Sequence, residues 1–119
     1  EGFDPALAEG VMLLTPFSAD ATDELTQNFV SAYQAAYGDI PNQFAADAYD
    51  AVYTVKAALE AAGCTSDMDA AAICEAMVAA MPTITVDGLT GQGMTWSSTG
   101  EVSKAPMAVV IKDGAYTLP

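Results

Sequence analysis

Residues 40–63, IPNQFAADAYDAVYTVKAALEAAG, carry the clearest pattern in this 119-residue chain. Asn42 is a favourable helix-capping residue and follows Pro41, so we expect a helix to begin there and to end at Gly63. Phe44 is then the first large side chain of the helix, in a turn whose backbone N–H groups have no partner within the helix. The position raises the question of whether Phe44 packs in a core or lines a recognition surface.

The helical wheel of this segment has a wide apolar face. One arc of about 100° contains these side chains: Phe44, Ala45, Ala48, Val52, Val55 and Leu59. So wide an apolar stripe predicts that the helix is mostly covered, with Val52, Val55 and Leu59 buried. Asp47, Asp50 and Thr54 lie together on the opposite side, and we expect Asp47 and Asp50 to face solvent.

The residues before this helix predict a strand and a first helix. The apolar run of residues 10–17, GVMLLTPF, is closed by Pro16 and favours a buried strand. Helical periodicity follows as far as Tyr37, and either Asp20 or Thr22 is suitable as its N-cap.

The residues after it predict a third helix and then strands. A cap cluster at residues 64–69 precedes apolar residues at helical spacing, and Pro82 ends the pattern. Glycines and β-branched residues follow. Residues 107–111 form an apolar run, and Asp113-Gly114 is a hairpin signal. The order of one strand, three helices and several strands predicts an α/β fold that is part of a larger protein.

The chain is strongly acidic. Sixteen acids against three lysines, with no arginine or histidine, give a net charge of −13. Nucleic-acid binding depends on Lys and Arg at phosphates, so it is excluded as a function class, and an anionic membrane surface would repel the chain. We interpret the acidity as a well-solvated surface.

The sequence offers no catalytic, cofactor or metal motif. Without histidine, and without a G-x-S-x-G nucleophile elbow, an enzyme is not expected. The acidic clusters at residues 20–24 and 67–69 do not have the spacing of a calcium loop, and no phosphate-binding loop is present. Cys64 and Cys74 either form a disulfide, worth about 2–3 kcal/mol, or are two free thiols, and the sequence leaves both readings open.

Several motifs resemble the C-terminal third of branched-chain amino-acid (Leu/Ile/Val) binding proteins, the periplasmic-type substrate-binding components of ABC transporters. Each motif is weak alone, but their order and spacing are specific. The matching elements are Tyr37-Gly38 with Pro41, FAADAYDAV at residues 44–52, GLTGQGMTW at residues 88–96, and KDGAY at residues 112–116.

The resemblance implies a partial type I periplasmic binding protein fold, with three helices packed with strands from the chain ends. Members of this family have two α/β lobes joined by hinge crossings. Residues 1–16 and 104–119 would then be second-lobe strands, and residues 21–102 a first-lobe segment. The chain would be a processed piece or C-terminal fragment, because it begins at Glu1.

The resemblance also implies a function. The protein would be extracytoplasmic, periplasmic or lipid-anchored, would bind a small amino acid without a cofactor, and would deliver it to an ABC permease. In this family an aromatic residue at the position of Phe44 lines the ligand cleft, and Phe17, beside the hinge proline, is a second candidate. The chain alone is not expected to bind ligand, because most of the cleft is absent from it.

Two other functions stay open at this level. The same fold serves ligand-sensing regulatory or receptor modules, and a small structural interaction domain could carry a similar sequence. Strands removed from larger sheets have open edges that tend to pair, so we expect a homodimer or a domain-swapped assembly.

Overall fold

The computed structural model describes residues 4–117. The chain divides into two compact units, and each is described separately. The first unit comprises Glu1–Ala46 and Pro106–Pro119, and the second comprises Asp47–Ala105. The predicted assignment of segments to two lobes of a larger protein stays a prediction.

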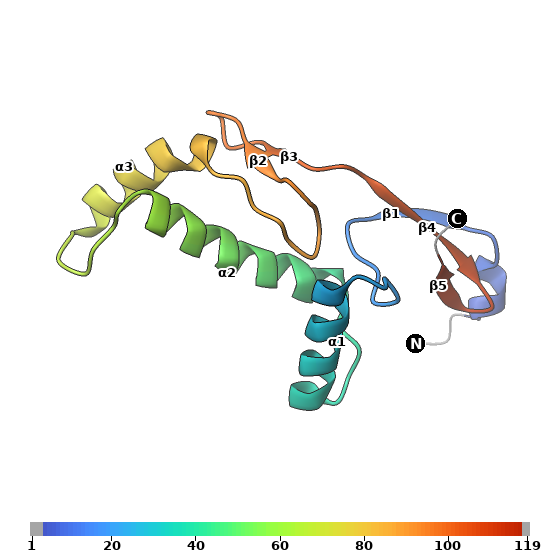
Figure 1. The fold of residues 1–119 in the computed structure, drawn as a ribbon. Coiled ribbons are helices and arrows are strands. Elements are labelled where there is room, and N and C mark those ends of the chain that lie inside the picture. The colour runs from blue at the N-terminus through green and yellow to red at the C-terminus, as the bar shows by residue number, and fades with distance from the viewer. Residues whose placement is uncertain (1–3, 118–119) are drawn as a thin grey trace. The chain divides into compact units, whose positions relative to one another are not determined.

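The first unit contains an antiparallel sheet made from both ends of the chain (Figure 1). A short 3-10 helix, η1 (Pro5–Ala8), precedes β1 (Met12–Thr15), which pairs with β4 (Met107–Lys112). β4 also pairs with β5 (Ala115–Thr117) through a turn at Asp113-Gly114. Both turn residues have positive φ, 52° and 77°, which is typical of a tight hairpin. The predicted hairpin is confirmed, and the two apolar runs near the chain ends pair with each other as β1 and β4.

The expectation that β1 is a buried strand is wrong. Side chains alternate across a strand, and this places Met12 and Leu14 on one face of the sheet. Both are exposed, because no described residue of the first unit covers that face, whereas Val109 in the central strand is fully buried.

Helix α1 (Glu24–Tyr37) also belongs to the first unit. Its N-cap is Asp23, whose carboxylate accepts a hydrogen bond from the Thr26 N–H at 2.9 Å, so the predicted caps are wrong by one to three residues. That hydrogen bond favours the charged carboxylate and lowers the pKa of Asp23 below its usual value. Gly38, in the left-handed conformation, ends the helix.

The second unit has its own core. α2 (Gln43–Ala61) begins in the first unit and continues into the second, followed by α3 (Ala70–Ala80), the 3-10 turn η2 (Met81–Thr83), β2 (Thr95–Trp96) and β3 (Val102–Ser103). The two short strands pair with each other. The core consists of these residues: Ala58, Ile84, Val86 and Met94, with Ala57, Met77, Met81 and Trp96 packed against them.

The burial of α2 is opposite to the expectation from its helical wheel. The buried side chains recur every four residues: Ala46, Asp50, Thr54 and Ala58. Asp50 is only 5% exposed, whereas Val52 is 68% and Val55 48% exposed. Within the second unit the polar stripe is the covered one, because Asp50 hydrogen-bonds to residues 89 and 90, and the small alanines allow close packing.

No helix among residues 4–117 is both long enough and apolar enough to cross a membrane.

Candidate functional site

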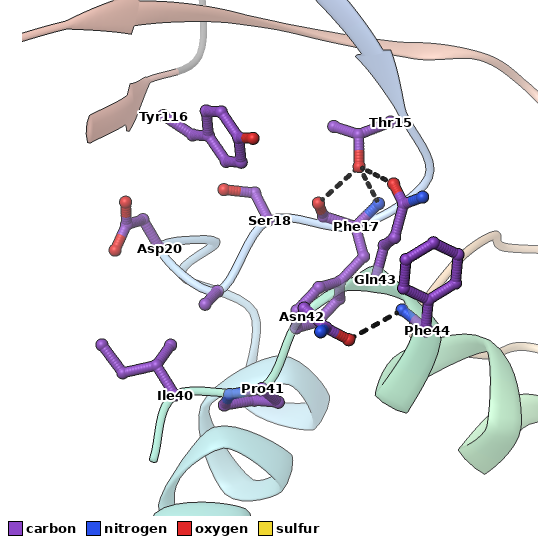
Figure 2. A pocket seen from close by; sticks show the side chains of 11 residues that line it. Thr15, Phe17, Ser18, Asp20, Ile40, Pro41, Asn42, Gln43, Phe44 and Tyr116 are labelled. Atoms are coloured by element: carbon purple, nitrogen blue, oxygen red, sulfur yellow. Dashed lines mark hydrogen bonds between the residues drawn. The ribbon is translucent and has the colours of Figure 1, made fainter. Parts of the chain in front are cut away.

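A pocket of about 550 Å³ lies in the first unit. Three segments form it: the end of β1 with the loop that follows, the loop before α2 with the first turn of that helix, and β5 (Figure 2). Its lining residues are Thr15, Phe17, Ser18, Ala19, Asp20, Ile40, Pro41, Asn42, Gln43, Phe44 and Tyr116.

The loop after β1 is a firmly held wall of this pocket. The Thr15 hydroxyl oxygen accepts a hydrogen bond from the Phe17 N–H at 3.3 Å and lies 2.9 Å from the Phe17 carbonyl oxygen. Phe17 is 4% exposed, and its ring packs edge-on against Phe29 at a centroid distance of 6.0 Å. The neighbouring Ser18 is equally buried. The wall is thus fixed both by hydrogen bonds and by aromatic packing.

The first turn of α2 forms the opposite side. Asn42 is its cap, as predicted: Asn42 Oδ1 accepts hydrogen bonds from the N–H groups of Phe44 and Ala45, each at 3.1 Å. These two N–H groups are therefore already paired, and the expectation of free backbone donors beside Phe44 is wrong for them. The Phe44 ring is 71% exposed, so it offers a large apolar surface.

One hydrogen bond connects the two sides of the pocket. Gln43 Oε1 lies 3.1 Å from the Thr15 hydroxyl, whose single proton is shared between Gln43 and the Phe17 carbonyl. This contact ties the end of β1 to the first residue of α2. Sequence reasoning missed it, because 28 residues separate the partners and neither belongs to a motif.

The charge of the pocket is simple. Asp20, at an exposed position, is the only ionisable carboxylate among its lining residues, and no lysine lines it. The remaining polar groups are neutral amides and hydroxyls. Such a lining can hold an apolar body and accept or donate a few hydrogen bonds, but it offers no cation for an anion.

The predicted site residues fall in different places. Phe17 and Phe44 both line the pocket, the first as buried wall and the second as exposed ring. Cys64 and Cys74 lie in the second unit and are free thiols in the structure, and the choice between a disulfide and two free thiols stays open. Among the described residues no group of three potential ligand side chains is placed to hold a metal ion.

A second polar cluster lies in the second unit and was not predicted. The Asp50 carboxylate accepts hydrogen bonds from the Leu89 N–H at 2.8 Å, the Thr90 N–H at 2.8 Å and the Thr90 hydroxyl at 2.6 Å. A Cβ on Gly88 would lie 2.6 Å from this carboxylate, so only glycine allows the loop to approach it. The bonds satisfy the carboxylate internally, which assigns this cluster a structural role.

The comparisons with known proteins agree with this fold. A family model described as periplasmic binding protein matches residues 2–115. The chain belongs to the periplasmic binding protein family. Searches found no match among curated proteins.

Solved structures of periplasmic binding proteins resemble the chain over almost its whole length. A protein from Rhodospirillum rubrum, described as a branched-chain amino acid ABC transporter, is 30% identical with a TM-score of 0.71, covering 99% of this chain and 35% of that one. A substrate-binding protein from Desulfitobacterium hafniense in complex with Leu is 26% identical, with a TM-score of 0.76 and coverages of 97% and 33%.

The fold also matches a receptor for a different ligand. A solute-binding protein from R. palustris in complex with benzoate is 20% identical, with a TM-score of 0.73 and coverages of 93% and 29%. At this identity the likeness concerns the fold alone. In all three comparisons the present chain spans only about a third of the length of the solved protein.

Proposed function

We propose that the chain is part of the extracytoplasmic solute-binding component of an ABC importer for branched-chain or related amino acids. The observation that carries the proposal is the pocket of the first unit, whose lining includes the exposed Phe44, neutral amides and one carboxylate, Asp20. An aliphatic amino acid has matching parts: an apolar side chain, an ammonium group and acceptor oxygens.

Membership of the family supports a binding role rather than catalysis, and the leucine complex of the D. hafniense protein supports the ligand class. The proposed mechanism is closure of two lobes on the ligand, which shifts the population towards the closed form. An ABC permease would then accept the amino acid. This chain would supply one wall of the cleft, and the clamps for the ammonium and carboxylate groups would come mainly from other parts of the full-length protein.

Calorimetric titration with leucine tests the proposal. The full-length protein that carries this chain is expected to bind leucine stoichiometrically, and the 119 residues alone are expected to give no measurable heat of binding. Phe44→Ala in the full-length protein should weaken binding, since the exposed ring loses its apolar contact with the ligand. Tight stoichiometric binding by the isolated chain would contradict this division of the site, and absence of amino-acid binding by the full-length protein would refute the function.

A further inference from the structure

We propose that Gln43 is a specificity-determining residue, which donates a hydrogen bond from its amide nitrogen to a carboxylate oxygen of the ligand. The inference rests on the proposed function and adds a residue to its site. Its basis is two sets of hydrogen bonds: Thr15 holds the oxygen of the Gln43 amide, and Asn42 occupies the backbone N–H groups of Phe44 and Ala45.

The Gln43 side chain is held at one end only. Its oxygen faces the Thr15 hydroxyl at 3.1 Å, and in Figure 2 its nitrogen points away from Thr15. Within residues 4–117 no hydrogen bond is formed by this nitrogen, so both of its N–H donors are available. Because Thr15 is itself tied to the Phe17 backbone, the amide is held in place before any ligand arrives. Such preorganisation lowers the entropy lost on binding.

Three backbone donors near Gln43 are already used. Asn42 Oδ1 accepts from the N–H groups of Phe44 and Ala45, and Thr15 accepts from the Phe17 N–H. A ligand oxygen near the Phe44 side chain therefore needs a donor other than these three, and a side-chain amide can provide it. Since no lysine lines the pocket, its positioned side-chain donors are neutral amides, and the Gln43 amide is one that Thr15 holds in place.

The substitution Gln43→Glu tests this role with little change of shape. Glu retains an acceptor oxygen for Thr15, but it replaces the free N–H donors with a second, negatively charged acceptor. A Glu at the first position of α2 is also favourable for the helix dipole, so the variant should fold. In the full-length protein we expect leucine affinity to fall about tenfold or more, because a hydrogen bond to a charged group is lost and two acceptors face each other.

Asn42→Asp is the matched control. Asp caps helices as well as Asn does, so this variant adds the same charge one residue away and leaves the Gln43 amide in place. We expect it to weaken leucine binding severalfold less than Gln43→Glu. Equal losses in the two variants would show a general charge effect and overturn the proposal.

The ligand preference gives a readout that a merely structural role would not change. Leucinamide presents N–H donors where leucine has a carboxylate, so Gln43→Glu should shift the ratio of the two affinities towards leucinamide by more than Asn42→Asp does. An unchanged ratio in Gln43→Glu, with wild-type leucine binding intact, would refute the role of Gln43 alone. Failure of the wild-type protein to bind leucine would instead refute the proposed function.

Discussion

Asp50 supplies the sharpest test of how the second unit is held together. Its carboxylate is buried and accepts three hydrogen bonds from Leu89 and Thr90, at 2.8, 2.8 and 2.6 Å. Hydrogen bonds to charged groups contribute about 1.5–3 kcal/mol each, and a buried donor left without a partner costs about 1–3 kcal/mol. These contributions are coupled through one carboxylate, so they do not add fully.

We expect Asp50→Ala to lower the free energy of unfolding by about 4 kcal/mol or more, as the loop loses every one of these bonds. Asp50→Asn keeps one acceptor oxygen but brings an NH₂ group against the donors of Thr90, so a loss of about 2–3 kcal/mol is expected. Because small proteins are stable by only about 5–15 kcal/mol, the alanine variant should be largely unfolded in moderate urea.

Trp96 is the assay. It is the single tryptophan of the chain and packs against the core of the second unit, so its fluorescence during urea unfolding reports on that unit. Asp47→Asn is the control, because Asp47 forms a partly exposed ion pair with Lys104 at 3.5 Å, and such pairs contribute about 1 kcal/mol or less. If Asp50→Asn unfolds within about 0.5 kcal/mol of Asp47→Asn, the buried carboxylate does not hold the loop and the reasoning fails.

The remaining predictions concern two local contacts and the association of the isolated chain. Gly88→Ala should destabilise the second unit, because its Cβ would lie 2.6 Å from the Asp50 carboxylate, and a Trp96 unfolding curve equal to the wild type would contradict this close approach. Asp23→Asn should keep the N-cap of α1 but remove the titratable carboxylate. The pKa of Asp23 in the folded protein is lowered from 3.8, so the charged carboxylate stabilises the wild type above that pH. As acid protonates the carboxylate, the wild type should lose this stability relative to the variant. If the difference in melting temperature between the two proteins stayed constant from pH 6 to pH 3, this prediction would be refuted. Light scattering should detect a dimer of the isolated chain, and a strict monomer at all concentrations would remove the expected pairing of open strand edges.

Local signals in the sequence were sufficient for the elements that depend on neighbouring residues. The Asn42 cap, the Gly38 helix end and the Asp113-Gly114 turn are each decided within a few residues, and the structure has all three. The start of α1 was missed by a small margin, because several adjacent acids and hydroxyls compete as caps and only the backbone geometry selects Asp23.

The burial of α2 could not be predicted, because its deciding partners are remote. Asp50 is buried against Leu89 and Thr90, which lie 39 and 40 positions further along the chain, and no local pattern encodes that contact. The helical wheel assumes that the most apolar face is the covered one. Here Val52 and Val55 are exposed within the described unit, while a stripe of alanines and hydrogen-bonded polar groups forms the packed face.

α2 therefore has two separate tasks along one helix. Its first turn is fixed by Asn42 and by the bond from Gln43 to Thr15, and it forms one side of the pocket. From Asp50 onward, the buried side chains at every fourth position are fixed by the loop at residues 89–90 and by the core around Ala58. Because the two sets of contacts involve different residues, substitutions at Gln43 should change ligand preference while substitutions at Asp50 should change stability. Separating these two effects experimentally distinguishes a residue of the site from a residue of its support.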